Sequence, residues 1–419
     1  MSYYNDDELA APDWINKEFL EKVLKEYHNN VAVEIVKFEL SPASMKGDHY
    51  ASVMFRCKVE YRLNATTLLN KSLIMKTIPS AEGMKQEILK KTKVFETEIG
   101  MYTEALPKIC QILKEHGEET LLTAGIIYHS LTPHKIIILE DLCELGYDAI
   151  RGRHLNVQEV KAVYTKLAKL HAVSFALGQS EDHKVVTKFQ DGFMSISIPA
   201  LSDYMDNGFR NFIQLLASYP EFEIYHQKLT EMQKYVLPSC KNLFNSYVNG
   251  EKGIFVLNHG DFHMKNLMFK WDRNSGEMED VILLDYQASC FAPSNIDLLY
   301  SQFLLLSPEL RMKRKEFMRH YFVEFCRILK KIKFNGDMPK YSEFQMDCLK
   351  YRHFCIYVLV VIYPLVAGFW DKSVEELKDT NTTEMVENPD LIAANYNRPE
   401  FVEEMRTFLP ILLDEGYFD

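Results

Sequence analysis

The 419-residue chain lacks an excess of basic residues and lacks paired cysteines. Its formal net charge is -11, so neither nucleic acid nor an anionic membrane is expected as the main partner, because both are bound through basic surfaces. The eight cysteines are scattered and form no C-x-x-C pair. This pattern argues against a zinc site or a disulfide framework and predicts buried, reduced thiols.

Long hydrophobic runs are also missing. The N-terminus has no basic segment followed by an apolar run, so no secretory signal is predicted and the cytosol is the expected location. The uncharged run from Cys355 to Trp370 has sixteen residues and contains Pro364 and Gly368. A spanning helix needs roughly 18 to 20 apolar residues, so the run predicts a buried helix and no membrane partner.

Glycine is scarce where a phosphate-binding loop would use it. The turn from Met45 to His49 contains one glycine, so G-x-G-x-x-G is absent, and taken alone the segment is better interpreted as an ordinary turn. The chain is otherwise typical of a globular protein, with 47% hydrophobic and 26% charged residues. Its length fits one protein of two lobes or two domains.

The stretch from Val256 to Gln287 carries the clearest chemistry. One apolar run leads to Asp261, with Asn266 five residues later, and a second run leads directly to Asp285. Phosphoryl transfer needs one acid that faces the attacking hydroxyl, and further oxygen ligands that hold Mg²⁺. We therefore expect Asp261 to orient the acceptor hydroxyl and accept its proton, and Asn266 and Asp285 to bind the metal.

Protein kinases share the Asp-x-x-x-x-Asn loop followed by a second aspartate. Here the loop opens with His259-Gly260-Asp261 instead of His-Arg-Asp. The replaced arginine commonly responds to phosphorylation of an activation loop. Its absence argues for a small-molecule kinase that lacks this switch.

The N-terminal third predicts a sheet followed by a helix. Apolar and polar residues alternate from Ala51 to Tyr61, which predicts a half-buried antiparallel strand, and residues 68–77 form its natural partner. Lys76 ends this second strand, where a lysine most often reaches solvent. In the segment that follows, Phe95, Ile99 and Tyr102 recur at helical spacing, which predicts a helix with one buried face. Glu98 is predicted to lie on that buried face.

A carboxylate on a buried face needs a partner, because an unpaired buried charge costs several kcal/mol. Lys76 is the expected partner of Glu98, whereas Glu96 is predicted to point away. Such a pair would aim the lysine at the α and β phosphates of a nucleotide, as in kinases.

The rest of the chain predicts a larger, mainly helical lobe. Asn156 is expected to cap its first long helix, and His171 on that helix is interpreted as a structural histidine that bonds to the catalytic loop. Asp297 is expected either to cap a helix or to brace the catalytic loop. Residues 189–247 are expected to be helical and are rich in aromatic residues. Most of these rings are expected to pack in an ordinary helical core, and some are candidates for an acceptor pocket. Residues 379–399 are interpreted as a surface loop or mobile flap.

The motifs H-G-D-F-H-M-K-N and L-L-D-Y-Q resemble the catalytic loop and metal motif of the aminoglycoside and choline kinase-like superfamily. The closer resemblance is to the ecdysteroid kinase-like family. It extends in family order through K-G-D-H-Y-A-S-V-M-F-R, L-I-M-K-T-I-P, F-E-T-E-I-G-M-Y, I-I-L-E-D-L and L-A-K-L-H-A-V-S-F-A-L. One departure is His263, where many members have tryptophan.

This resemblance implies an α+β, bilobal protein kinase-like fold that uses ATP and Mg²⁺. A nucleotide-binding lobe is expected over 1–141 and a catalytic, acceptor-binding lobe over 142–419, with a hinge at about 140–146. The backbone of Glu140 and Leu142 would then bind adenine, and Ser52 would act in a loop that covers the phosphates. Bracing is the role that the resemblance favours for Asp297.

The resemblance also implies a small-molecule alcohol as substrate, either an ecdysteroid or a hydroxylated xenobiotic undergoing detoxication. Two alternatives remain. A choline- or ethanolamine-type kinase would need an aromatic and acidic cage for a cationic acceptor. A catalytically silent pseudokinase would bind a ligand without phosphorylating it. No oligomeric state is predicted.

Overall fold

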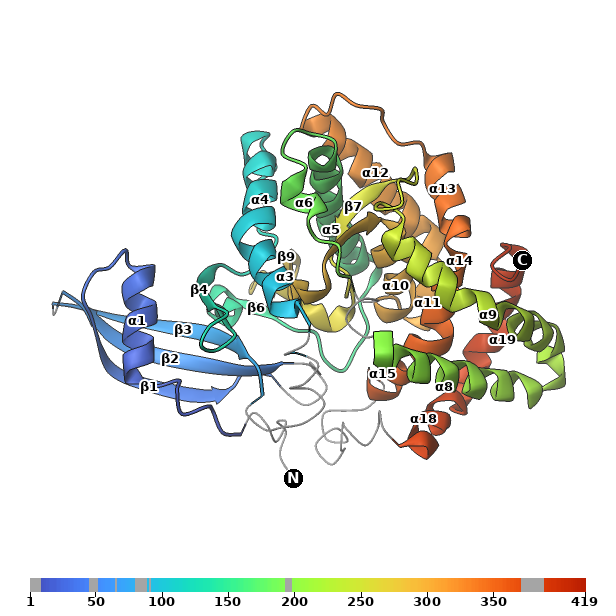
Figure 1. Cartoon of the computed structure of the whole chain (residues 1–419), viewed down its shortest axis with the longest axis horizontal. Coiled ribbons are helices and arrows are strands. Elements are labelled where there is room, and N and C mark those ends of the chain that lie inside the picture. The colour runs from blue at the N-terminus through green and yellow to red at the C-terminus, as the bar shows by residue number, and fades with distance from the viewer. Residues whose placement is uncertain are drawn as a thin grey trace.

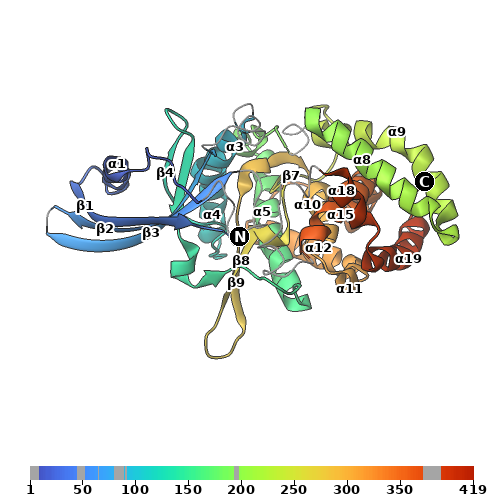
Figure 2. The same cartoon turned by 90° about the horizontal axis from the view of Figure 1, so that it is seen from below.

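An antiparallel sheet forms the N-terminal lobe, and the C-terminal part of the chain is mostly helical (Figure 1). The computed structural model describes residues 9–44, 52–64, 66–79, 89, 92–192, 198–370 and 388–419, with the backbone alone for 198–205 and 368–370. Seen from below, the sheet and helices α8, α9, α18 and α19 lie at opposite ends of the molecule (Figure 2). The α+β fold class predicted from the sequence is confirmed.

The sheet of the N-terminal lobe has five antiparallel strands in the order β1-β2-β3-β5-β4. The two strands predicted from alternation are β2 and β3, which pair in register through the turn that joins them. β1 was not predicted, because it is an edge strand with one buried side chain, Ile35, and so has little hydrophobic periodicity. The bounds are β1 Val33–Pro42, β2 Val53–Leu63, β3 Thr67–Thr77, β4 Ile126–Ser130 and β5 Ile136–Glu140.

The two faces of this sheet have different surroundings. Helix α1, Lys17–Tyr27, covers one face, where its Leu20 and Val23 join Val53 and Phe55 in a common core. The side chains of β2 that alternate with this core point to the opposite face. Met54 on that face lines the cavity discussed below.

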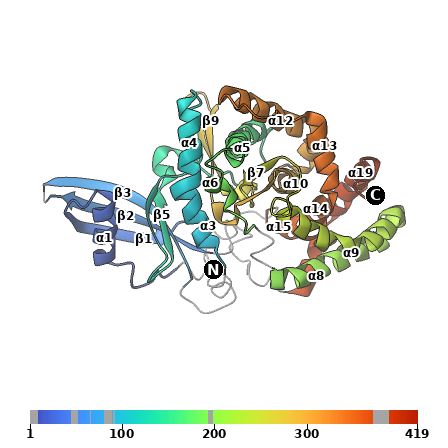
Figure 3. The same ribbon diagram turned by 45° about the horizontal axis from the view of Figure 1, so that its top comes forward.

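Three helical segments connect β3 to β4 in sequence, and α3 and α4 lie between the sheet and α5 (Figure 3). Glu98 is 2% exposed, whereas the Glu96 side chain is 38% exposed and pairs with Lys135, so the predicted sidedness of the two glutamates is confirmed. The segments are α3 Val94–Gly100, a π-helical turn η2 Met101–Ala105 and α4 Leu106–Glu115. Irregular π turns of this kind are frequent at functional sites.

The C-terminal part is built on α5, Val157–Gly178, whose predicted cap is present. The Asn156 side chain accepts hydrogen bonds from the backbone of Gln158 and Glu159, and the Glu159 carboxylate accepts one from the Asn156 backbone. Two small sheets lie beside α5, one of β6-β8-β9 and one of β10-β7. Their strands are β6 Tyr147–Asp148, β7 Phe255–Asn258, β8 Leu267–Trp271, β9 Met278–Leu283 and β10 Cys290–Pro293.

The remaining helices surround these sheets and extend the molecule away from the N-terminal lobe. The α-helices are α6 Lys184–Thr187, α8 Ile198–Ala217, α9 Glu223–Asn245, α10 Asn295–Leu304, α11 Pro308–Arg311, α12 Arg314–Lys331, α13 Tyr341–Lys350, α14 Arg352–Tyr357, α15 Tyr363–Trp370, α18 Pro389–Tyr396 and α19 Pro399–Asp414. Short 3-10 or π turns are η3 Leu142–Leu145, η4 Pro220–Phe222, η5 Met264–Asn266, η6 Tyr286–Ala288 and η7 Val358–Ile362.

The uncharged run predicted as a buried helix is divided between α14, η7 and α15. Its residues from Cys355 to Val361 are at most 1% exposed and belong to a core shared with α8, α9 and α19. No single helix of the described residues is long and apolar enough to cross a membrane, although Tyr341–Lys350 and Arg352–Ala367, bent by 55°, reach that limit together by length and composition. Burial explains the hydrophobicity of the second helix.

Two smaller predictions come out differently, and the expected core packing of the aromatic helices is confirmed for most of the described rings. The predicted loop or flap over residues 379–399 includes helix α18, and residues 371–387 lie outside the described part. Cys143 is exposed, although all the cysteines were predicted to be buried, whereas Cys57, Cys240, Cys290 and Cys355 are buried. Most of the described rings of residues 189–247 are packed in the core, and Tyr235 is exposed.

Candidate active site

The loop that carries Asp261 begins at the end of β7 with a sharp backbone turn. Gly260 has a φ of 84°, a left-handed conformation that side chains other than glycine rarely adopt. A Cβ at this position would also collide with the carbonyl oxygen of Ala288. The turn therefore depends on glycine, and it directs Asp261 away from the β7 strand.

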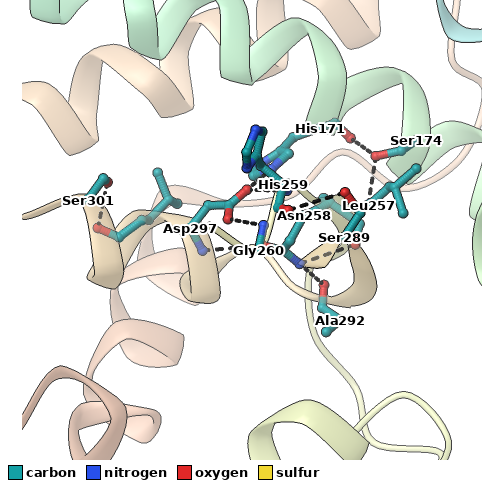
Figure 4. Close-up of polar contacts among 12 residues, drawn as sticks. His171, Ser174, Leu257, Asn258, His259, Gly260, Ser289, Ala292, Asp297 and Ser301 are labelled. Atoms are coloured by element: carbon teal, nitrogen blue, oxygen red, sulfur yellow. Dashed lines mark hydrogen bonds and ion pairs between the residues drawn. The ribbon is translucent and has the colours of Figure 1, made fainter. Parts of the chain in front are cut away.

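Asp297 holds this loop in place from the first turn of α10. Its fully buried carboxylate accepts hydrogen bonds from the backbone N–H groups of His259, at 2.6 Å, and Gly260, at 2.8 Å (Figure 4). The Asp297 backbone N–H is in turn bonded to the side-chain oxygen of Asn258 at 3.3 Å. Bracing, rather than capping, is thus the role of the Asp297 carboxylate.

His171 contributes to the same network without touching the loop itself. Its ring lies between the hydroxyl of Tyr321, 2.8 Å from Nδ1, and the Asp297 carboxylate, 3.1 Å from Nε2. His171 is fully buried, which supports the prediction of a structural histidine. The histidine reaches the catalytic loop only through Asp297 and does not bond to the loop directly. Sequence spacing could not show this relay, because the partners are 126 and 150 residues away.

His259 connects the two segments that were predicted to act together. Burial lowers the pKa of its imidazole more than the nearby carboxylates raise it, so the ring is neutral. Nδ1 accepts a hydrogen bond from the Asp261 backbone, and Nε2 therefore donates to the carbonyl of Leu284 at 2.7 Å. Since Leu284 precedes Asp285, the imidazole fixes the spacing between the two aspartate segments.

The carboxylate of Asp261 receives several hydrogen bonds. Tyr300 donates to Oδ1 at 2.8 Å, His263 Nε2 lies 3.3 Å from the same atom, and Asn266 Nδ2 donates to Oδ2 at 3.2 Å. Burial alone would raise the pKa of this carboxyl group, but His263 and Tyr300 outweigh burial and hold the pKa below its ordinary value. Asp261 is consequently ionised, so both of its carboxylate oxygens act as hydrogen-bond acceptors.

Lys76 joins the sheet to the second aspartate segment. Its ammonium group is 2.6 Å from Glu98 Oε2, as predicted, and 2.7 Å from Asp285 Oδ1, which was not predicted. Burial alone would lower the pKa of Lys76, but the carboxylates of Asp285 and Glu98 raise it by more, so the side chain stays protonated. Asp285 itself has a φ of 62° and ψ of 67°, a strained conformation that often marks functional positions.

A cavity of about 330 Å³ lies beside these residues, between the sheet and the C-terminal part. Its lining includes the predicted site residues Lys76, Glu98, Glu140, Leu142, Asn266 and Asp285. Asp261 adjoins the cavity through Asn266. Ser52 is 4% exposed and is not part of the lining, and the turn over Met45–His49 lies outside the described residues.

The family model of the ecdysteroid kinase-like family matches residues 46–334, which include every residue of this site. The chain belongs to this family. The enzyme is accordingly a small-molecule phosphotransferase, as its motifs predicted. No curated protein sequence matches the chain.

Solved structures of kinases resemble the enzyme over nearly its whole length. Ethanolamine kinase from Plasmodium vivax is 13% identical, with 93% of this chain and 91% of that chain covered and a TM-score of 0.41. An aminoglycoside phosphotransferase from Alicyclobacillus acidocaldarius is 12% identical, with 86% and 90% covered and a TM-score of 0.35. A phosphotransferase in complex with GDP and kanamycin is also 12% identical, with 94% and 99% covered and a TM-score of 0.40.

One cluster in the cavity wall of the enzyme was missed from the sequence. Asp141, 4% exposed, accepts hydrogen bonds from Arg56 Nε and Ser72 Oγ, both at 2.7 Å, and from the Cys143 backbone at 3.1 Å. Burial alone would raise the pKa of this carboxyl group, but Arg56 and Ser72 lower it by more, so the pKa lies below its ordinary value. The alternation of β2 does place Arg56 on the face of Met54, and this was the available signal.

Replacing Asp297 tests the brace on the catalytic loop. The side chain of Asp297→Asn has one acceptor oxygen in place of two, and its NH₂ group cannot accept a hydrogen bond. One of the two backbone N–H groups, that of His259 or Gly260, therefore loses its partner. We expect the free energy of unfolding to fall by about 1.5 to 3 kcal/mol, as for a lost hydrogen bond to a charged group, with a loss of turnover. Urea unfolding and an ATP-consumption assay measure the two effects. Asp337→Asn, at an exposed position, is the matched control, and equal stability of the two variants would contradict the brace.

Proposed function

We propose that the enzyme transfers the γ-phosphoryl group of ATP to a hydroxyl group of a small molecule in a Mg²⁺-dependent reaction. An ecdysteroid or a hydroxylated xenobiotic is the proposed acceptor. The observation that carries the proposal is that Lys76, Asn266 and Asp285 line one cavity and that Asp261 bonds to Asn266 beside it. These groups come from three segments far apart in sequence, and each has a distinct part in phosphoryl transfer.

Lys76 is suited to binding nucleotide phosphates. The Glu98 carboxylate, 2% exposed, fixes the ammonium group at one side of the cavity, and the group keeps its charge. A fixed cation in a poorly hydrated site attracts phosphate more strongly than a mobile surface lysine does. Glu140, the last residue of β5, and Leu142 also line the cavity, and their backbone groups are proposed to bind the base.

Asn266 and Asp285 are the proposed ligands of Mg²⁺. The Asn266 amide nitrogen donates to the Asp261 backbone and side chain, so its amide oxygen is the group left for a cation. Within the described part of the chain, no three His, Cys, Asp or Glu side chains form a metal cluster. This fits Mg²⁺, which is usually held by one or two carboxylates together with substrate phosphates. When bound, the ion would neutralise charge on the phosphates.

Asp261 is proposed to accept the proton of the acceptor hydroxyl. The O–H bond of the acceptor breaks, its oxygen forms a bond to the γ phosphorus, and the bond from that phosphorus to ADP breaks. The proton passes to the Asp261 carboxylate and then to solvent after the products leave. Because Asp261 is ionised and held by its neighbours, it is ready for this step before the substrate binds.

Mass spectrometry of reaction mixtures tests the proposed reaction. The purified enzyme is incubated with Mg-ATP and separate acceptors, namely an ecdysteroid, hydroxylated xenobiotics, choline and ethanolamine. A mass increase of one phosphate on an ecdysteroid or xenobiotic is the expected result. Phosphorylation of choline or ethanolamine alone would replace the proposed acceptor class. Tight binding of an acceptor without phosphorylation of any would instead identify a pseudokinase.

Asp261→Asn separates chemistry from nucleotide binding. The amide cannot take the proton, so turnover should fall by about 10² to 10⁴, the usual share of a general base. The Kd of Mg-ATP should stay within a few-fold of the wild-type value, because Asp261 is not part of the cavity lining. Steady-state turnover and calorimetric titration with ATP measure these quantities, and equal losses in both would remove the assignment.

Asp285→Asn tests the metal assignment. Asparagine tolerates the left-handed backbone of Asp285, so the fold should be kept, but one negative charge near Lys76 is lost. We expect the enhancement of ATP binding by Mg²⁺ to disappear and turnover with it. ATP titrations with Mg²⁺ and with EDTA provide the comparison. A variant that still gains affinity from Mg²⁺ would show that the ion is held elsewhere.

A further inference from the structure

Tyr300 is the residue outside the predicted site that contacts the proposed base most closely. It lies on α10 one turn after Asp297, and its hydroxyl donates to Asp261 Oδ1 at 2.8 Å. The side chain is 6% exposed. Burial and the charge of Asp261 both raise the pKa of the Tyr300 phenol, so it keeps its proton and acts as a donor.

His263 donates to the same oxygen. Its Nδ1 accepts a hydrogen bond from the Lys265 backbone at 3.2 Å, so in the neutral ring the proton is on Nε2. Nε2 lies 3.3 Å from Asp261 Oδ1 and 3.3 Å from Asn266 Nδ2, whose two protons are donated to the backbone carbonyl and Oδ2 of Asp261. Nε2 is therefore assigned as a donor to Oδ1, which receives two hydrogen bonds, one from Tyr300 and one from His263.

The two oxygens of Asp261 are therefore not equivalent. Each carboxylate oxygen can accept about two hydrogen bonds. Oδ1 has both from Tyr300 and His263, whereas Oδ2 has one from Asn266 Nδ2 at 3.2 Å. Oδ2 is thus the oxygen with acceptor capacity left for a substrate.

We propose that Tyr300 is a positioning residue, which together with His263 saturates Oδ1 of Asp261 and leaves Oδ2 to accept the proton of the acceptor hydroxyl. This inference rests on the proposed role of Asp261. Proximity and orientation of reacting groups contribute strongly to phosphoryl transfer, so a base whose carboxylate can rotate is a poorer catalyst. Tyr300 acts through Asp261 and not on the nucleotide.

Tyr300→Phe removes the hydroxyl and keeps the ring. We expect kcat of the folded variant to fall by about 10- to 100-fold, the range for one hydrogen bond to a charged group, while the Kd of Mg-ATP stays unchanged. Tyr357→Phe is the matched control, because this tyrosine is 1% exposed and its hydroxyl has no hydrogen-bond partner among the described residues. Unchanged kcat in Tyr300→Phe would overturn the inference.

A double-mutant comparison tests whether Tyr300 acts through Asp261. In an Asp261→Ala background, adding Tyr300→Phe should cause no further loss of kcat, because the oxygen that it positions is gone. A further loss as large as in the wild-type background would overturn the inference. The proposed function fails separately, if Asp261→Ala alone keeps full turnover.

His263→Leu keeps the inference testable if Tyr300→Phe does not fold. It removes the second donor to Oδ1, and the expected result is again a lower kcat with an unchanged Kd of Mg-ATP. A His263→Leu enzyme with wild-type kcat would overturn the saturation of Oδ1.

Discussion

The ammonium group of Lys76 is the point on which the arrangement of the active site depends. It is buried between two carboxylates, Glu98 of α3 and Asp285 after β9, so a single charge joins the sheet, a helix and the segment that carries Asp285. Removing one partner of a buried ion pair costs more than the pair contributes, because the remaining charge is left without compensation. These contacts hold the sheet against the C-terminal part beside the cavity, and they orient the ammonium group that is proposed to bind phosphate.

The catalytic loop is held by a different kind of interaction. A fully buried carboxylate, Asp297, satisfies two backbone N–H groups at the glycine turn, and a neutral imidazole, His259, links the loop to the carbonyl before Asp285. Buried polar groups that are fully satisfied give a rigid local structure, since each alternative leaves a donor unpaired. The distance between the proposed base and the proposed metal ligands is thus set by hydrogen bonds within the protein.

Local patterns predicted the parts of this site that depend on local structure. The pairing of a second strand with the alternating one put Lys76 near the end of β3, and helical spacing put Glu98 on the buried face of α3, because both patterns follow from backbone geometry. The contacts of Tyr300 with Asp261 and of Arg56 with Asp141 join residues 39 and 85 positions apart, and no periodicity relates them. Tyr300 could have been found only after Asp297 was assigned as the brace, since it lies three residues further on the same helix.

The position of His263 can now be understood from its neighbour. Many family members have tryptophan where this chain has histidine, and the two side chains differ in size and in their capacity to accept hydrogen bonds. They share one property, a ring N–H donor. His263 Nε2, which we assign as such a donor, lies 3.3 Å from Oδ1 of Asp261, an oxygen that also receives the Tyr300 hydroxyl. If the carboxylate needs a donor here, both residues meet that need, so the departure from the family pattern leaves the orientation of the base intact.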